Sequence, residues 1–252
     1  RTLRPLSPRP RRKHVSMTHS SDPSALDENP PPRFPDRWRL HRAGIVNVWH
    51  YLDVEFVLSG GRMILRGTNG SGKSRALEML LPFLLDADRR RMDATGAAKV
   101  DLDELMRTGA SDITDRVGYL WLELARPSGH LTIRAHIRHR ADARRSDVHF
   151  FTTSLRVGTE LHLVDDARIP LSRERLADLV GADNLTRDPE RHRETVRRLV
   201  FGLHGETGRE RYDGLLQLLH TLRSPDVGHR IDEGRLPQIL SDALPPLPEN
   251  ML

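Results

Sequence analysis

The residues best suited to chemistry form one short glycine-rich stretch. They match the pattern G-x-x-x-x-G-K-[ST], which binds the phosphates of nucleotides, and they are Gly67, Thr68, Asn69, Gly70, Ser71, Gly72, Lys73 and Ser74. Glycine lets the backbone curl until several N–H groups point inward at phosphate oxygens. The sequence therefore predicts a phosphate-binding loop, with Arg75 immediately after it among the binding residues.

Two side chains of this loop have separate predicted tasks. Lys73 reaches the β- and γ-phosphates of a nucleotide, and the Ser74 hydroxyl is a ligand for Mg²⁺. A helix that begins near Lys73 adds the partial positive charge of its N-terminus at the same point. ATP and magnesium are therefore the expected ligands, and a glycine-rich turn without a ligand is the alternative.

A metal-associated acid is the next feature that this chemistry requires. The residues Leu161-His162-Leu163-Val164 precede Asp165 and resemble an apolar Walker B strand that precedes its carboxylate. However, residues 148–164 alternate and turn at Gly158, which favours an antiparallel hairpin over a buried parallel strand. A turn before Pro170 is therefore preferred to a magnesium site at Asp165.

The composition indicates neither a thiolate site nor a membrane span. The chain has 252 residues, 37% of them hydrophobic, and no cysteine. Its 13 histidines lack metal-ligand spacing, which predicts no zinc, and His41, His136 and His139 are expected at exposed strand positions. No apolar run approaches 18 residues, so we expect no contact with a membrane. Without a signal-like start the expected location is cytoplasmic.

The hydrophobic pattern predicts the elements that position the loop. Strands are expected at 39–46, 53–58, 62–66, 116–125, 131–139 and 148–157, with a short one at 161–164. Helices are expected at 76–85 with a break at Pro82, and at 101–106, 172–180, 188–201, 209–222 and 232–243. Together they predict an α/β fold with a mixed sheet around the phosphate-loop helix, an antiparallel meander and a helical C-terminal section.

The N-terminal segment differs in composition from the remainder. Residues 1–36 hold eight of the 17 prolines, and 1–16 hold six basic residues but no acidic one, so 17–252 carry a net charge of −1. Such a segment buries too little apolar surface to offset its ordering entropy, which predicts a disordered tail. Met17 is a plausible native start. A basic arm that contacts nucleic acid is the alternative.

The motif Gly67-x-Asn69-Gly70-x-Gly72-Lys73-Ser74 is more specific than the general phosphate-loop pattern. It resembles the loop of ABC-type, SMC, MukB and SbcC-like ATPases. Residues 39–85, with 118–124 and 240–247, resemble the N-terminal head segment of the large SMC-like subunit of Wadjet-type plasmid-defence systems. The resemblance covers residues 38–252 and implies the N-terminal lobe of an SMC-like head, ending before its coiled coil.

This resemblance implies partners that complete the site. In such heads a C-terminal lobe supplies the signature, the Walker B Asp and the catalytic Glu, and two heads then engage ATP and handle DNA. Leu58–Arg62 is similar to the LSGGQ signature, but its position before the loop favours a hairpin turn. Gln217 and Gln238 match no Q-loop motif. The resemblance implies a phosphate-contacting arginine among 89–91, as an alternative to a solvated charge run. It also implies adenine stacking by Trp49 or Tyr51, as an alternative to core packing.

Three functional hypotheses remain from the sequence. The first is the ATP-binding half of an SMC-like ATPase, in which hydrolysis requires the C-terminal lobe and a second head. The second is a self-sufficient P-loop kinase or GTPase with Asp165 as the magnesium acid, although no N-K-x-D guanine motif is present. The third is a non-catalytic interaction fragment that retains the loop.

Overall fold

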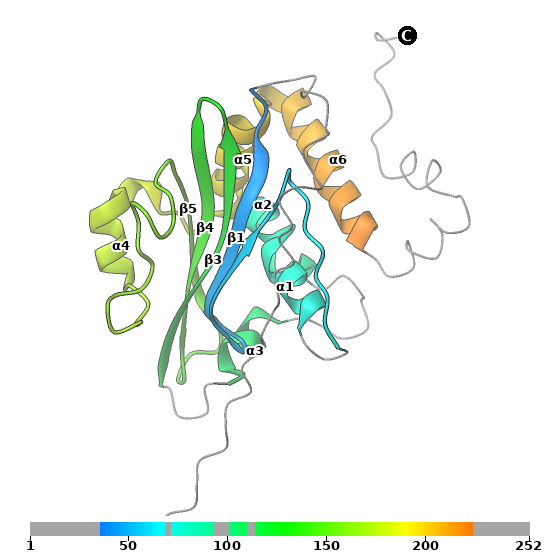
Figure 1. Ribbon diagram of the computed structural model, residues 1–252. Coiled ribbons are helices and arrows are strands. Elements are labelled where there is room, and N and C mark those ends of the chain that lie inside the picture. The colour runs from blue at the N-terminus through cyan, green and yellow to red at the C-terminus, as the bar shows by residue number, and fades with distance from the viewer. Residues whose placement is uncertain (1–35, 69–71, 93–100, 110–113, 224–252) are drawn as a thin grey trace, which may run out of the picture.

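The computed structural model describes residues 36–68, 72–92, 101–109 and 114–223. These residues build a five-stranded sheet in the order β2-β1-β3-β4-β5 (Figure 1). The strands are β1 Arg39–Val48, β2 Tyr51–Val57, β3 Asp115–Arg126, β4 Gly129–Arg140 and β5 Asp147–Thr153. Each neighbouring pair is antiparallel, and β3, β4 and β5 form the predicted meander.

The predicted α/β class is confirmed, but the predicted mixed sheet is wrong, because every ladder of the described sheet is antiparallel. The strand expected at 62–66 does not form. Arg62 pairs only with Ser59 in an isolated bridge, and within the described residues 63–66 make no backbone hydrogen bond. A strand requires a neighbour for its N–H and C=O groups, and the described part of the chain provides none here. Residues 161–164 likewise form isolated bridges only.

The described helices lie at or near the predicted ranges, although α6 begins before the predicted residue 209. They are α1 Lys73–Leu80, α2 Phe83–Asp86, α3 Leu102–Arg107, α4 Arg173–Val180, α5 Pro189–Phe201 and α6 Gly205–Arg223. The Asp188 side chain accepts a hydrogen bond from the Glu190 amide at the start of α5, as predicted. Pro82 separates α1 from α2. The helix predicted at 232–243 and the tail at 1–35 lie outside the described residues. None of the described helices is both long and apolar enough to cross a membrane.

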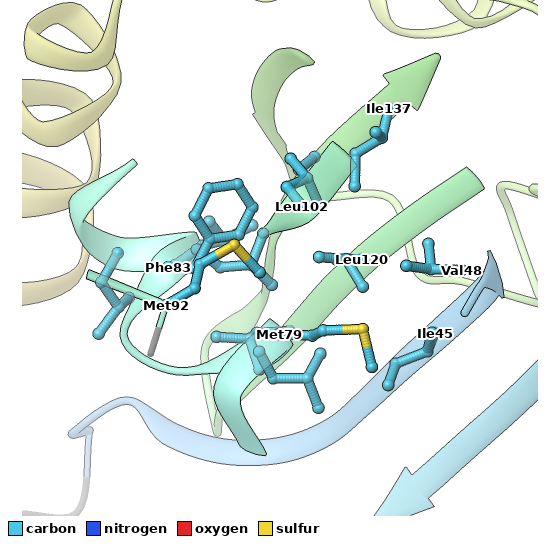
Figure 2. Packing of buried hydrophobic residues seen from close by; sticks show 14 of the residues in the cluster. Ile45, Val48, Met79, Phe83, Met92, Leu102, Leu120 and Ile137 are labelled. Atoms are coloured by element: carbon cyan, nitrogen blue, oxygen red, sulfur yellow. The ribbon is translucent and has the colours of Figure 1, made fainter. Parts of the chain in front are cut away.

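The main hydrophobic core lies on the sheet face covered by α1, α2, α3, α5 and α6 (Figures 1 and 2). Figure 2 shows Met79 of α1 and Phe83 of α2 directed at Ile45 of β1 and Leu120 of β3, all four fully buried. This core fixes α1, and therefore the end of the glycine-rich loop, against the centre of the sheet.

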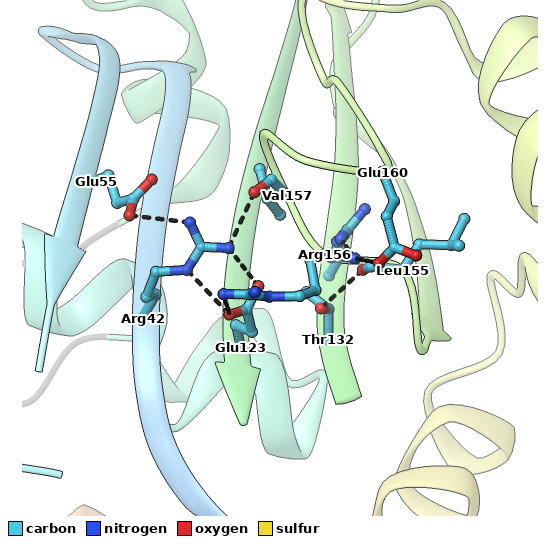
Figure 3. A network of polar contacts seen from close by, with 9 residues as sticks. Arg42, Glu55, Glu123, Thr132, Leu155, Arg156, Val157 and Glu160 are labelled. Carbon is cyan, nitrogen blue, oxygen red and sulfur yellow. Dashed lines mark hydrogen bonds and ion pairs between the residues drawn. The ribbon is translucent and has the colours of Figure 1, made fainter. Parts of the chain in front are cut away.

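The other sheet face is covered by α4 and by the segment 154–171. Its apolar part includes Tyr119 and Trp121 of β3, whereas its polar part joins Arg42 to Glu123 beneath the covering segment (Figure 3). His136 of β4 faces the same side beside Tyr119, with ring centroids 5.3 Å apart.

The predicted exposure of two strand histidines is wrong. His136 is 1% exposed and His139 is 5% exposed. The strand pattern predicts that this face of β4 is polar and exposed. His136 is buried because α4 and the segment 154–171 cover that face. The Nδ1 atom of His139 lies 3.1 Å from the Ser146 hydroxyl. Both positions therefore belong to the interior of the fold.

The burial of His192 on α5 predicts acid sensitivity. Burial lowers the pKa of His192 to about 4, while its Nε2 atom lies 2.9 Å from the Leu84 carbonyl oxygen. The unfolded chain binds this proton below pH about 6.5, so stability falls as the pH drops from 6.5 to 4, by at most about 1.4 kcal/mol per pH unit. Denaturant titrations at several pH values measure this dependence. For His192→Phe, the free energy of unfolding should change less steeply with pH between 6.5 and 4. The exposed-site variant His162→Gln should keep the parental slope, and equal slopes in all three proteins would contradict this prediction.

Candidate phosphate-binding site

The candidate site lies where an extended segment enters α1. A tight turn at Gly60-Gly61, closed by the Ser59–Arg62 bridge, reverses the chain after β2. The hairpin-turn interpretation of Leu58–Arg62 is therefore confirmed. From there the chain runs to Thr68, and α1 begins at Lys73 with Gly72 as its N-cap.

The Lys73 ammonium lies at the start of the loop. Its Nζ atom donates hydrogen bonds to the carbonyl oxygens of Gly67 at 2.7 Å and Thr68 at 2.9 Å. These contacts bring the first and last parts of the glycine-rich stretch together. An ammonium group has three donor hydrogens and no acceptor, so phosphate oxygens can take the place of neutral carbonyls as stronger, charged acceptors.

Gly72 occupies a position that excludes a side chain. Its φ angle is 95°, in the left-handed region that favours glycine. A Cβ atom there would lie 2.6 Å from Cζ3 of Trp49 and 2.7 Å from Oη of Tyr51. Glycine is thus required at position 72 both by the backbone conformation and by the two aromatic side chains beside it.

The first turn of α1 is suited to an anion. It contains no acidic side chain, and Gly72 provides no side-chain cap. The N–H groups that open a helix have no intrahelical partner, so those of Ser74 and Arg75 are donors of the kind that hold phosphate. The Ser74 side chain is exposed. The Arg75 guanidinium lies 3.3 Å from the Glu78 carboxylate.

The structure brings together Gly67, Thr68, Gly72 and Lys73, while Asn69, Gly70 and Ser71 lie outside the described residues. Tyr51 joins the group, because its hydroxyl donates a hydrogen bond to the Gly72 carbonyl oxygen at 3.0 Å. Burial raises the pKa of Tyr51, which keeps this hydroxyl protonated. Core packing of Tyr51 is confirmed, since it is 6% exposed. The contact with Gly72 was missed, because nothing local relates two residues 21 positions apart.

Asp165 does not join this group. Residues around it pack into the hydrophobic cluster with α4, on the sheet face opposite α1. Its carboxylate accepts a hydrogen bond from the Ile169 amide at 2.8 Å and closes a turn before Pro170. The preferred interpretation of this stretch as a turn is confirmed.

The arginines at 89–91 form a short 3₁₀ helix capped by Asp88. Arg90 and Arg91 are exposed and lie 3.6 and 3.7 Å from the Asp88 carboxylate, as a solvated charge run predicts. Arg89 differs, because its guanidinium donates to the Ser146 carbonyl oxygen at 2.6 Å. Gln217 is exposed on α6, and Gln238 lies outside the described residues.

Two cavities lie apart from the loop, at the β5 edge of the sheet. One of about 470 Å³ is lined by His149, Arg173 and Arg187 among others. The second, of about 380 Å³, lies between η3 (Ala182–Asn184) and α5. In the first cavity both arginines lie near acids: Arg187 lies 3.4 Å from Asp147, and Arg173 lies 3.2 Å from Glu174. Neither cavity includes a residue of the glycine-rich loop.

The chain finds no match among protein-family models, among curated proteins or among solved structures. Support for phosphate binding therefore comes from the residues of the loop themselves, above all from Lys73 and Gly72 at the start of α1.

Proposed function

We propose that this chain is the ATP-binding N-terminal half of an SMC-like ATPase of the chromosome-maintenance or plasmid-defence type. In this proposal the loop binds MgATP, and hydrolysis requires a C-terminal lobe from the same or a split protein. Engagement with a second head then allows the assembly to act on DNA. The observation that carries the proposal is the Lys73 ammonium held within the loop that opens α1.

The residues at the loop suit a nucleoside triphosphate. The amides at the start of α1 and the Lys73 ammonium are hydrogen-bond donors within one short stretch of chain, which suits the β- and γ-phosphates. The exposed Ser74 hydroxyl is placed in the first turn, where it would hold Mg²⁺. When bound, the metal would neutralise charge on the phosphates. No acidic side chain in this first turn opposes an anion.

The segment before the loop supports the need for a further lobe. Residues 63–65 are apolar, yet in the described structure the backbone groups of 63–66 make no hydrogen bond to another residue. Ile64 is 78% exposed, and Leu77 on α1 is 46% exposed. Unpaired backbone and exposed large apolar side chains mark surfaces that associate with another polypeptide. A complementary lobe would cover them.

A self-sufficient kinase or GTPase is less well supported. That alternative requires an acid beside the metal, and its candidate, Asp165, lies on the opposite sheet face in a closed turn. The proposal therefore assigns the magnesium-associated acid to the C-terminal lobe. NTP turnover by the purified chain alone, abolished by Asp165→Asn, would favour the alternative.

MgATP titration of the purified chain by calorimetry tests the proposal. Lys73→Ala should weaken binding by about ten- to a hundredfold, because it removes charge-assisted hydrogen bonds to phosphate. The matched control is Arg62→Ala, which removes one exposed cation outside the motif. Equal affinities of the parent and Lys73→Ala proteins would reject the phosphate-loop role and favour a non-catalytic interaction fragment.

A further inference from the structure

We propose that Tyr51 is a positioning residue for the phosphate loop, acting through the carbonyl group of Gly72. The inference rests on the proposed function, and it assigns to a β2 residue the control of the loop's geometry. Its basis is the 3.0 Å hydrogen bond from the Tyr51 hydroxyl to the Gly72 oxygen. Tyr51 does not touch the phosphates in this account.

The peptide group between Gly72 and Lys73 transmits the effect. A trans peptide is planar, with its C=O and N–H pointing in opposite directions. The Gly72 oxygen accepts one hydrogen bond from the Ala76 amide at 3.0 Å and a second from Tyr51. By fixing this carbonyl, Tyr51 also fixes the direction of the Lys73 N–H, which opens α1 and faces the loop.

The cap of α1 gives this contact its importance. Ser, Thr, Asp and Asn are the usual N-caps, since their side chains accept from the amides of the first turn. Gly72 cannot do so, which leaves those amides available to a ligand but also leaves a flexible residue at the helix start. The Tyr51 and Trp49 rings occupy the space beside its Cα and limit that flexibility.

The turn that presents these rings is itself held firmly. Trp49 has a left-handed φ of 54°, and its amide donates to the Leu105 carbonyl oxygen of α3 at 3.0 Å. Its own carbonyl oxygen accepts from the Arg116 guanidinium at 2.7 Å. The same guanidinium donates to the carbonyl oxygens of Met106 and Thr108. Tyr51 is therefore a fixed support, and Arg116 connects α3 to the turn that carries Trp49.

Removal of one hydroxyl tests the inference. Tyr51→Phe keeps the ring against Trp49 and Phe56 but loses the bond to Gly72. The matched control is Tyr212→Phe, because the Tyr212 hydroxyl donates to the Leu85 carbonyl oxygen at 2.8 Å from a buried site on α6. Affinities for MgATP and for magnesium tripolyphosphate are measured on the full chain, well below the melting temperature of every variant, with Lys73→Ala alongside.

Tyr51→Phe should bind both ligands about three- to tenfold more weakly than the parent, the factor that one neutral hydrogen bond contributes. An equal loss for both ligands is expected, since the effect acts on the phosphates. Tyr212→Phe should bind as the parent does, although its melting temperature falls similarly. If Lys73→Ala weakens binding but Tyr51→Phe matches the parent or Tyr212→Phe, the positioning role is rejected and the proposed function stands. If Lys73→Ala also binds normally, the proposed function itself fails.

Discussion

Replacement of Glu123 by alanine should lower the free energy of unfolding by about 3–5 kcal/mol, because it removes the buried carboxylate that pairs with Arg42 and Arg156. The Glu123 side chain is fully buried on β3 and accepts two hydrogen bonds from Arg42, at 2.5 and 3.0 Å (Figure 3). Arg156 lies 3.5 Å from the same carboxylate. Chemical denaturation of the parent and variant proteins measures the loss.

Glu55→Ala is the matched control for this change. Glu55 pairs with the same guanidinium at 3.1 Å, but its side chain is 42% exposed. A solvated pair contributes at most about 1 kcal/mol, so the control should lose no more than that. Equal losses in the Glu55 and Glu123 variants would contradict the assignment of the buried carboxylate as the charge that holds β1, β3 and the covering segment together.

The Glu123 network also predicts a pH dependence. Burial alone would raise the pKa of Glu123, but the hydrogen bonds and charge of Arg42, with Arg156, outweigh it and hold the pKa below its usual value. A carboxylate with a depressed folded pKa contributes stability above its unfolded pKa, and this contribution is lost as the pH falls. The difference in stability between parent and Glu123→Ala proteins should therefore shrink below about pH 4.5.

Gly72→Ala should abolish measurable MgATP binding, with an affinity loss of at least about a hundredfold, or about 2.7 kcal/mol. The left-handed φ of 95° costs a non-glycine residue about 1–2 kcal/mol. The added Cβ atom also overlaps the Trp49 and Tyr51 side chains, which adds about 1–3 kcal/mol of packing strain. Both costs are relieved only if the start of α1 shifts, and that shift displaces the Lys73 amide. Calorimetric titration and thermal melting measure the two effects.

The control for this variant is Gly60→Ala. Gly60 also has a positive φ, 57°, but a Cβ atom there meets nothing within 4 Å. It should lose about 1–2 kcal/mol of stability and bind MgATP as the parent does. If Gly72→Ala and Gly60→Ala bind equally well, the start of α1 does not set the geometry of a phosphate site.

Local signals in the sequence were sufficient for much of this fold. Asp188 and Pro189 begin α5 because an N-cap acceptor and a first-turn proline act within three residues. Pro82 ends the regular part of α1, and Gly60-Gly61 forms the turn, through backbone constraints of the residues themselves. The glycine-rich motif is similarly local, so the start of a helix near Lys73 was predicted from the sequence alone.

Features that depend on distant partners were not accessible in this way. The residue pattern at 62–66 predicted a strand, but strand formation requires a neighbouring strand that the local sequence does not specify. His136 was expected at the surface, and only the arrangement of α4 over β4 buries it. The hydrogen bond from Tyr51 to Gly72 likewise depends on how β2 meets α1.

The most direct test of the central claim is an amide NMR titration of the full chain with MgATP. The account predicts large, saturable shifts of the Gly72, Lys73 and Ser74 amide signals, because these groups open α1 at the phosphate-binding loop. Lys73→Ala should remove the saturable shifts at the same concentrations. Unchanged signals at these three residues in the parent protein, or saturable shifts confined to the cavity beside Arg187, would contradict the account.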